Sequence, residues 1–235
     1  MNTFGITHKG LVRTKNQDRF FVQEFPDGSV LLAVADGLGG QEGGDRASAI
    51  AKESLHNFDP ALEDIGRHLV ELMRLADEEI RQTAENEPQL KGMGTTMTAA
   101  YVRQDTVYWA HVGDSRLYLF RQELLSQITE DNTMAGFLLA EGQLTKEEAR
   151  VHPGRMFLFE CVGCGDFEVD TGQFRIKDGD LLLLSTDGLH DEVPESIIVS
   201  LLKTKDSLEK KLAALVNAAL NRGGSDNIAI VGLEM

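Results

Sequence analysis

The chain has 235 residues, a hydrophobic content of 42% and a formal net charge of -15 at pH 7. This length fits one large domain or two small ones, and the apolar content is ample for a buried core, which excludes a disordered chain. The acidic balance disfavours binding to nucleic acids, which meet a basic face, and to anionic membranes. Solubility alone explains the charge.

The N-terminal residues and the two cysteines are the sequence features that indicate the cellular compartment of the protein. The opening stretch lacks the charged-then-apolar pattern of a signal peptide, and the longest apolar runs are too short to span a bilayer. Cys161 and Cys164 form a lone CxxC pair, without the further ligands of a structural zinc site or the further cysteines of a disulfide framework. We therefore expect no redox or metal role for the pair, and a cytoplasmic, reducing location.

Residues 1–83 predict three strands followed by two helices. The strands lie around Phe4–Ile6 and at Arg19–Phe25 and Val30–Ala35, with a polar loop before the second strand and a turn before the third. A glycine-rich loop from Gly37 to Gly44 then leads into a helix that starts near Asp45 and reaches Phe58. Apolar residues three and four apart predict a longer helix over 60–83, with Pro60 in its first turn.

Residues 92–151 predict a group of strands and then two short helices. The strands are Thr95–Arg103, Thr106–Val112, Arg116–Arg121 and Leu124–Ile128, and their short connections predict antiparallel neighbours. A tight turn explains Gly113-Asp114 between two of them. A helix over Asn132–Glu141 is followed by another that opens with a capping box, Thr145 to Glu148. Such an insertion between strands predicts a mobile surface subdomain.

The last third predicts three strands, two helices and a final strand. The strands are Met156–Cys161, Glu168–Ile176 and Leu181–Ser185, the helices Pro194–Thr204 and Ser207–Leu220, and the final strand Ile228–Leu233. Asp206 and Glu209 form a capping arrangement for the second helix. The element order predicts an α+β fold with two sheets sandwiched by helix pairs. With no linker or repeat in view, residues 1–235 are expected to form a single domain.

Asp36 follows a buried strand and opens the glycine-rich loop. The loop lacks the Gly-Lys-Ser/Thr of a P-loop, and Glu42 stands where a dinucleotide fingerprint needs glycine. Asp36, Glu42 and Asp45 would also repel bare phosphate. An acidic, glycine-lined loop suits a hard cation such as Mg²⁺, Mn²⁺ or Ca²⁺, while a strand–turn–helix corner with a capping Asp is an equally simple interpretation.

Asp187 and Asp226 stand at two further strand ends, and a set of short motifs surrounds all three acids. The motifs are RTKNQD (13–18), VADGLGG (34–40), GTT (94–96), VGDSR (112–116), STDGLHD (185–191) and GSDNI (224–228). Each is weak alone, but in this order and over nearly the whole chain they resemble the metal-dependent protein serine/threonine phosphatases, the PPM or type-2C family. The resemblance is greatest to the compact bacterial branch.

The resemblance implies a four-layer αββα sandwich, in which helix pairs flank two antiparallel sheets and a helical flap spans about residues 132–160. It implies a binuclear Mn²⁺ or Mg²⁺ centre in a cleft at one end, with a third metal position in bacterial relatives. The implied roles are: Asp36, bridging both metals; the Gly37 carbonyl, on the second; Asp187 and Asp226, on the first; Asp114 with Asp187, on the third; Asp18 and Gln17, in the outer shell; Arg13, on the substrate phosphate.

The implied activity is hydrolysis of phosphoserine and phosphothreonine in proteins. A hydroxide bridging the two ions would attack phosphorus in line, without a phosphoenzyme, and metal charge would shield its repulsion from the phosphoryl oxygens. Expected partners are phosphoprotein substrates and an opposing kinase, and the chain is expected to be a monomer. Two alternatives stay open: a phosphatase restricted to one signalling phosphoprotein or a small phosphometabolite, and a non-catalytic regulatory module of the same fold.

Four departures from the family pattern qualify these expectations. Gln17 stands where many relatives have Glu, and Leu38 where eukaryotic members carry a His proposed to protonate the leaving group. Asn132 replaces a common His, and Phe159 to Gly163 replaces a more basic stretch beside the flap. No histidine is expected to ligate metal directly, because carboxylates already meet that need; His152 and His190 are expected to have capping or surface roles.

Overall fold

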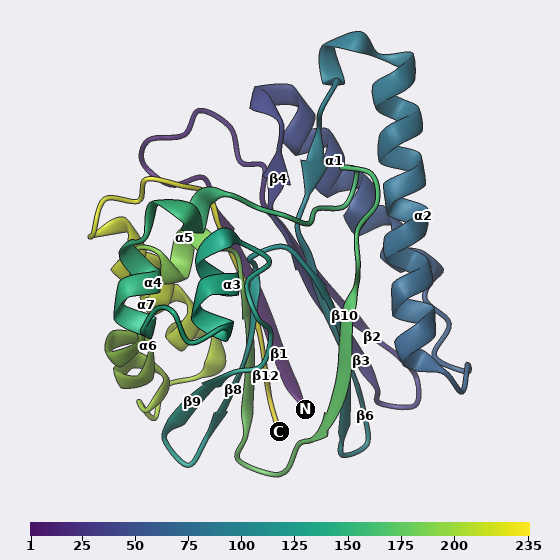
Figure 1. The fold of residues 1–235 in the computed structure, drawn as a ribbon. Coiled ribbons are helices and arrows are strands. Elements are labelled where there is room, and N and C mark those ends of the chain that lie inside the picture. Colours follow the sequence, from purple (N-terminus) through teal and green to yellow (C-terminus); the bar gives the residue numbers. More distant parts are fainter.

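The computed structural model describes residues 1–235, except for the side chain of Gln41. Its centre is a pair of five-stranded antiparallel sheets (Figure 1). The first sheet has the order β1 (Asn2–His8), β12 (Ile228–Glu234), β11 (Leu181–Ser185), β8 (Arg116–Arg121), β9 (Leu124–Gln127). The second has the order β10 (Asp170–Arg175), β7 (Thr106–Val112), β6 (Met97–Arg103), β3 (Val30–Ala35), β2 (Arg19–Glu24). Two short strands, β4 (Gly37–Leu38) and β5 (Gly94–Thr95), pair beside them.

Helices cover the outer face of each sheet, which confirms the predicted α+β sandwich (Figure 1). The second sheet carries α1 (Gly40–Ser54) and α2 (Ile65–Asn86), and the first carries α6 (Glu195–Leu202) and α7 (Leu208–Leu220). The smaller helices are α3 (Met134–Ala140), α4 (Lys146–Val151) and α5 (Asp187–His190), with single turns of 3₁₀ helix at η1 (Leu55–Asn57), η2 (Pro88–Leu90) and η3 (Pro153–Met156).

The alternation of side chains along the central strands creates three apolar layers. In β3, Leu31 and Ala33 face α1 and α2, whereas Leu32 and Val34 face the other sheet. Leu183 in β11 likewise packs toward α6 and α7. Because both faces of these strands are buried, their sequences are continuous apolar runs instead of alternating ones. The sheets are thereby held face to face, and the loops at their ends meet.

The helix boundaries differ from the sequence expectations in three places. The first helix begins at Gly40, before Asp45. The second begins at Ile65, so Pro60 lies outside it, because the Asp64 side chain caps it by accepting from the Arg67 amide at 3.0 Å. The last begins after Ser207 without a side-chain cap, so the expected Asp206 and Glu209 arrangement does not form. The predicted capping box, Thr145 with Glu148, is confirmed.

The region expected as a strand over Met156–Cys161 is irregular. It begins at the end of η3 and makes one isolated bridge, Leu158 with Thr133, while Val162, just beyond it, bridges Thr95, so no neighbouring strand pairs along its length. Cys161 and Cys164 follow this irregular segment and lie next to each other, with their Cα atoms 5.4 Å apart. No helix in the described part of the chain is long and apolar enough to cross a membrane.

The Gly113–Ser115 connection has a different role from the tight turn expected between antiparallel neighbours. It leaves β7 in the second sheet and enters β8 in the first, so it crosses the sandwich. The crossing places Asp114 between the two sheets, at the end where the other acidic loops gather.

Candidate metal centre

Strand pairing brings the predicted acidic residues to one end of the molecule. Asp18 precedes β2 and Asp36 follows β3, and the antiparallel register sets their neighbours Arg19 and Ala35 opposite each other. In the other sheet Asp187 follows β11 and Asp226 precedes β12, two strands that also pair antiparallel. Carboxylates from both sheets therefore meet with Asp114 from the crossing connection.

Burial and mutual repulsion raise the pKa of the clustered carboxyl groups. Asp18 is 1% exposed, and its removal from water raises its pKa to about 8, with the charges of Asp187 and Asp226 adding to the shift. Burial, followed by the charges of Asp191 and Asp226, raises the pKa of Asp187 to about 7. The pKa of Asp36 also rises strongly, because of burial first and the charges of Asp18, Asp187 and Asp114 next.

The donor set fits a hard divalent cation. Two carboxylate oxygens, Asp18 Oδ2 and Asp187 Oδ1, are buried without a hydrogen-bond partner. Buried charges of one sign are unfavourable unless they are paired or coordinate a metal. As the side chains stand, no group of three or more His, Cys, Asp or Glu among the described residues forms a ready coordination shell. The carboxylates are nevertheless close enough to shift one another's pKa.

Arg13 supplies a positive charge beside Asp226 and Asp187. Its Nη2 donates to Asp226 Oδ2 at 2.6 Å, and its side chain is half exposed at the surface. This hydrogen bond, and the charges of Asp226, Asp187 and Asp36, raise the pKa of the guanidinium. The predicted phosphate-binding residue therefore lies at the rim of the acidic cluster.

Asn227 fixes the loop that carries Arg13, a role that its motif did not reveal. The side chain is 3% exposed, and its Nδ2 donates to the carbonyls of Lys9 and Lys15 at 2.7 and 2.9 Å. Its Oδ1 accepts from the Gln17 amide at 2.8 Å. The loop from residue 9 to residue 17 is thus anchored beside Asp226. Its position directly after Asp226 was the available sequence signal.

The backbone of Asp36 is held by a buried hydroxyl network. Its amide donates to Thr96 Oγ1 at 3.0 Å, and its carbonyl accepts from Thr95 Oγ1 at 2.8 Å. Thr96 Oγ1 also lies 2.7 Å from Ser115 Oγ, next to Asp114. The Gly-Thr-Thr motif therefore orients one expected metal ligand and links it to another, a role that the sequence did not indicate.

The glycines of the Asp36 loop permit close backbone contact. A Cβ added at Gly44 would lie 2.5 Å from the Gly37 carbonyl oxygen and 2.5 Å from Gln17 Nε2. Gln17 Nε2 donates to the Gly40 carbonyl at 2.6 Å. The structure thus places Gln17 against the glycine loop, and Leu38 in β4 pairs with Gly94 in β5.

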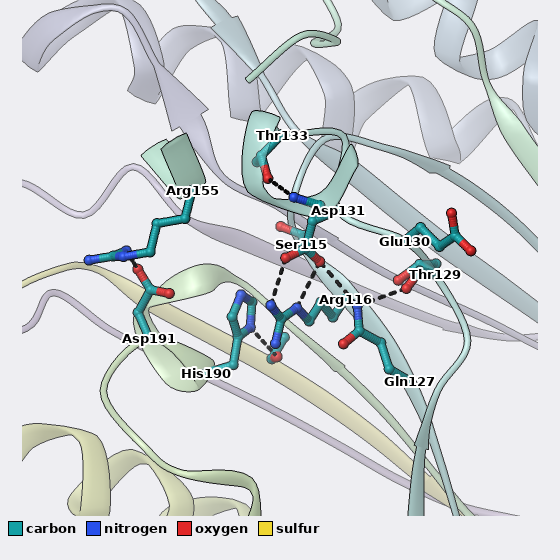
Figure 2. Close-up of polar contacts among 12 residues, drawn as sticks. Ser115, Arg116, Gln127, Thr129, Glu130, Asp131, Thr133, Arg155, His190 and Asp191 are labelled. Atoms are coloured by element: carbon teal, nitrogen blue, oxygen red, sulfur yellow. Dashed lines mark hydrogen bonds and ion pairs between the residues drawn. The ribbon is translucent and has the colours of Figure 1, made fainter. Parts of the chain in front are cut away.

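The flap contacts the cluster through α5 and the crossing connection. Figure 2 shows the flap residue Arg155 ion-paired with Asp191, which caps the C-terminus of α5, the short helix that Asp187 begins. Arg150 Nη2 donates to the Asp191 carbonyl at 3.1 Å. Asn132 accepts from the Gly113 amide through Oδ1 at 2.6 Å. These flap residues therefore contact segments that carry Asp187 and Asp114.

A second ion pair, between Arg116 and Asp131, lies next to the start of the flap. Arg116 binds Asp131 through two hydrogen bonds, Nε to Oδ1 at 2.8 Å and Nη2 to Oδ2 at 2.6 Å (Figure 2). Paired forks of this kind are strong and geometrically specific. His152 Nδ1 accepts from the Gly154 amide at 3.0 Å, the capping role expected of it, whereas His190 is buried and not on the surface.

Comparison with known proteins places this architecture in a family. A family model described as protein phosphatase 2C matches residues 8–229. The chain is 38% identical to the serine/threonine phosphatase stp of Listeria monocytogenes over 235 residues, 97% of this chain and 93% of that protein. The crystal structure of the Mycobacterium tuberculosis serine/threonine phosphatase PstP/Ppp superposes with a TM-score of 0.90 at 33% identity, covering 100% of this chain and 99% of that one.

A further solved structure contains metal. It is the PstP catalytic domain in complex with 2 manganese ions, which matches with a TM-score of 0.87 at 32% identity over 98% of this chain and 96% of that one. The chain therefore belongs to the protein phosphatase 2C family, the metal-dependent PPM phosphatases. It is an enzyme of the protein phosphatase class, and it groups with the bacterial members, as the motifs indicated.

Proposed function

We propose that this protein hydrolyses phosphoserine and phosphothreonine in proteins, with two divalent ions, Mn²⁺ or Mg²⁺, bound at the acidic cluster. One observation carries the proposal: carboxylates from the ends of both sheets converge, and two of their buried oxygens lack partners. The residues proposed to hold the ions are Asp36, Asp187 and Asp226 with the Gly37 carbonyl, and Asp114 with Asp187 at a third position. Asp18 and Gln17 are proposed to lie in the outer shell.

The chemistry of these ligands suits phosphate ester hydrolysis. Hard divalent ions bound there would lower the pKa of water toward neutrality and compensate the negative charge of the phosphoryl group. The protein contributes the arrangement of ligands. The Thr95 and Thr96 hydroxyls fix the Asp36 backbone, and the hydrogen bonds of Asn227 fix the loop next to Asp226.

Arg13 is proposed to orient the substrate phosphate. Its guanidinium pairs with Asp226 in the structure and is half exposed, so it faces both the cluster and the solvent. A planar guanidinium can bind two phosphate oxygens at once, which holds the ester for in-line attack. Leu38 has no proton to donate, so we infer that the leaving oxygen takes its proton from water.

The remaining expectations belong to the same proposal. Residues 1–235 would act as a single PPM-type phosphatase domain, with the flap at about residues 132–160 facing the substrate entrance. The physiological substrates would be cytoplasmic phosphoproteins modified by an opposing serine/threonine kinase, and the enzyme would act as a monomer. The similarity of this chain to bacterial serine/threonine phosphatases supports this assignment.

The test compares hydrolysis by the wild type, Asp36→Asn and Asp206→Asn. Asp206 is an exposed residue between α6 and α7, so its variant controls for loss of one negative charge. With Mn²⁺ or Mg²⁺ present, the wild type and Asp206→Asn should hydrolyse p-nitrophenyl phosphate and a phosphothreonine peptide equally. Asp36→Asn should lose at least about 100-fold in kcat, since it weakens the main ligand.

Equal activity of Asp36→Asn and the wild type would refute the metal centre. Calorimetric Mn²⁺ binding without hydrolysis of either substrate would favour a non-catalytic module. Comparing a phosphoprotein with a small phosphometabolite separates the two substrate classes, because the chemistry is shared and only kcat/KM distinguishes them.

A further inference from the structure

Exposed apolar side chains gather in two segments that contact the loops of the acidic cluster. Twelve large hydrophobic side chains are exposed in the described part of the chain, and eight of them lie in these segments. Leu11 and Val12 directly precede Arg13 in the residue 9–17 loop. The other six, which we call the apolar flap face, are Met134, Phe137, Val151, Met156, Phe157 and Phe159. Single exposed hydrophobics need no explanation, whereas a contiguous group marks a binding surface.

Two phenylalanines of the apolar flap face share one side of an extended segment. The Met134 amide donates to the Phe157 carbonyl at 3.1 Å, and the Phe159 amide donates to the Asn132 carbonyl at 2.8 Å. Between these two hydrogen bonds lies Leu158, which is half-buried. Successive side chains of an extended chain point to opposite sides. Phe157 and Phe159 therefore lie together on the side away from Leu158.

The helix α3 and the turn η3 continue the apolar flap face. A Cβ added at Gly154 would lie 3.0 Å from Met134 Cβ, so Met134, the first residue of α3, packs on η3. Phe137 follows three residues later and shares that side of the helix. Met156 is the last residue of η3, and Val151 ends α4 just before it. The six side chains thus form one surface.

The apolar flap face adjoins the acidic cluster at both ends of its extended segment. Asn132, whose carbonyl accepts from the Phe159 amide, exchanges two hydrogen bonds with Gly113, at 2.6 and 2.7 Å, and Gly113 precedes Asp114. At the other end Arg155 is ion-paired with the C-terminal cap of α5 (Figure 2). In Figure 1 the chain after η3 crosses the end of the molecule from α5 toward β4 before it descends as β10.

The charges of the flap disfavour an acidic peptide and a second copy of the chain as the occupant. Arg155 pairs with Asp191, and Arg150 donates to the Asp191 carbonyl, so both flap arginines are engaged within the protein. The chain has a formal net charge of -15, and a large net charge of one sign keeps separate copies apart. A peptide with apolar residues meets neither of these obstacles.

We propose that the apolar flap face selects phosphopeptides with bulky apolar residues within two positions of the phosphoserine or phosphothreonine. This inference names the substrate class of the proposed function and rests on it. A peptide held at the cluster by its phosphate extends about 7 Å over two residues, so its neighbouring side chains reach the adjoining flap. There they leave water against Phe157 and Phe159, and Leu11 and Val12 add apolar surface beside Arg13.

The first experiment compares phosphothreonine peptides that are identical except for the two residues on each side of the phosphothreonine. These residues are leucine, alanine, aspartate or lysine. At about 0.15 M salt, where charges are screened over about 8 Å, kcat/KM should be about tenfold higher for the leucine peptide than for the alanine peptide. Equal values for these two, or a higher value for the aspartate or lysine peptide, would overturn the proposal.

The second experiment measures the same leucine-to-alanine ratio of kcat/KM in Phe157→Ala and Phe159→Ala, whose substitutions lie at exposed positions. A ratio within one variant cancels any general loss of activity. It should fall to about threefold or less in each. Leu124→Ala is the matched control, because Leu124 is 70% exposed and lies at the end of the β8–β9 hairpin remote from Asp114. It should keep the wild-type ratio, and equal ratios in all variants would contradict the role of the flap.

The third experiment measures binding without turnover, using wild-type protein with Mg²⁺ and peptides whose phosphate ester oxygen is replaced by CH₂. Methyl NMR follows Met134 and Met156, with the exposed Met1 as internal control. The leucine analogue should shift the first two methyl signals, leave Met1 unchanged and bind about tenfold more tightly than the alanine analogue. Shifts of the same methyls with protein concentration alone would assign the face to a second copy and overturn the proposal.

These experiments separate the inference from the proposed function. If every phosphothreonine peptide is hydrolysed at the same rate, the proposed function stands and the selection by the flap is wrong. If no peptide is hydrolysed but the leucine analogue still binds at Met134 and Met156, the proposed function fails and the apolar flap face remains a peptide-binding surface.

Discussion

Asn227 shows how a single buried side chain can fix a loop beside the acidic cluster. Its amide joins three backbone groups of the residue 9–17 loop, and it follows Asp226 in sequence. All of its hydrogen-bonding groups are used inside the protein. Removing such a buried group leaves its former partners unsatisfied, which costs more than the hydrogen bonds themselves contribute.

We expect Asn227→Ala to lower kcat/KM about tenfold or more, since Arg13 and its loop lose their anchor. The free energy of unfolding should fall by about 1–3 kcal/mol, which urea titration measures. Asn217→Ala, at an exposed position in α7, is the matched control and should change neither quantity. A variant with unchanged KM for p-nitrophenyl phosphate and unchanged kcat would disprove the anchoring role.

The motifs identified the acidic residues but not the groups that position them. Asp36 and Asp187 were predictable because each follows an apolar strand and opens a motif. The support from Thr96 and Asn227 depends on contacts between residues 60 and more than 200 positions apart, which local sequence patterns do not encode. The same limit explains why the position of Gln17, against the Gly40 carbonyl, emerged only from the structure.

At the scale of elements, the connection from β3 to α1 depends on close contact between the backbone at Gly37 and the backbone at Gly44. The Gly37 carbonyl oxygen lies 2.5 Å from where a Cβ of Gly44 would stand, so the N-terminal part of α1 touches the loop after Asp36. Only glycine at position 44 permits this contact without a shift of the loop. The predicted start of the helix at Asp45 was therefore late: the helix begins within the glycine run, at Gly40.

Gly44→Ala should destabilise the protein by about 2 kcal/mol and weaken Mn²⁺ binding, because the added methyl displaces Gly37. Gly66→Ala is a contrasting control inside α2, where an added Cβ would have only the Asp64 carboxylate nearby, at 3.9 Å. That change should stabilise the protein by up to about 1 kcal/mol through helix propensity. Thermal unfolding and calorimetry distinguish the two; equal behaviour of both variants would refute the close-contact argument.

The flap is joined to α5 by the Arg155–Asp191 ion pair, in which both side chains are about one-third exposed. Arg155→Met should weaken this docking by about 1 kcal/mol, about fivefold in the opening equilibrium. Hydrogen exchange in residues 134–151 should rise accordingly, while hydrolysis of p-nitrophenyl phosphate should change less than hydrolysis of a phosphopeptide.

Arg175→Met is the control for that experiment, because it breaks an exposed ion pair, with Asp105, whose two residues both lie outside the flap. Its effect on exchange in residues 134–151 should be nil. If Arg155→Met behaved in the same way, the ion pair would have no part in docking the flap.

Regular elements were easier to predict from sequence than the segments between them. The strands β3, β7, β8 and β11 have the boundaries that their apolar patterns indicate. The strand expected over Met156–Cys161 was wrong, because a strand needs a partner along its length and only Leu158 in this segment makes a β-bridge. The crossing at Gly113–Ser115 also resembled a hairpin turn locally, and only the sheet order distinguishes the two.

For the whole molecule, the raised carboxyl pKa values predict how stability depends on pH. Asp18 and Asp187 titrate at about 8 and about 7 in the folded chain, against an unfolded value of 3.8. The folded state therefore binds more protons than the unfolded state between these values. The stability that protonation provides is fully present below about pH 4 and is lost as pH rises toward 8.

Metal-free protein should accordingly lose thermal stability between pH 5 and pH 8 from this cluster, and added Mn²⁺ should restore it. The rise in melting temperature on adding Mn²⁺ should be larger at pH 8 than at pH 6, because at pH 6 the ion must displace protons. Calorimetry in two buffers of different ionisation enthalpy should show proton release at pH 6. A metal effect independent of pH would contradict the assigned pKa shifts.

The two sheets divide the acidic residues between them, with Asp18 and Asp36 at the end of one and Asp187 and Asp226 at the same end of the other. An ion bound by these side chains, as proposed, would tie together two layers whose facing surfaces pack mainly through apolar contact. The catalytic activity and the attachment of one sheet to the other would then both depend on the same bound ion. Sliding of one layer past the other would lower both together.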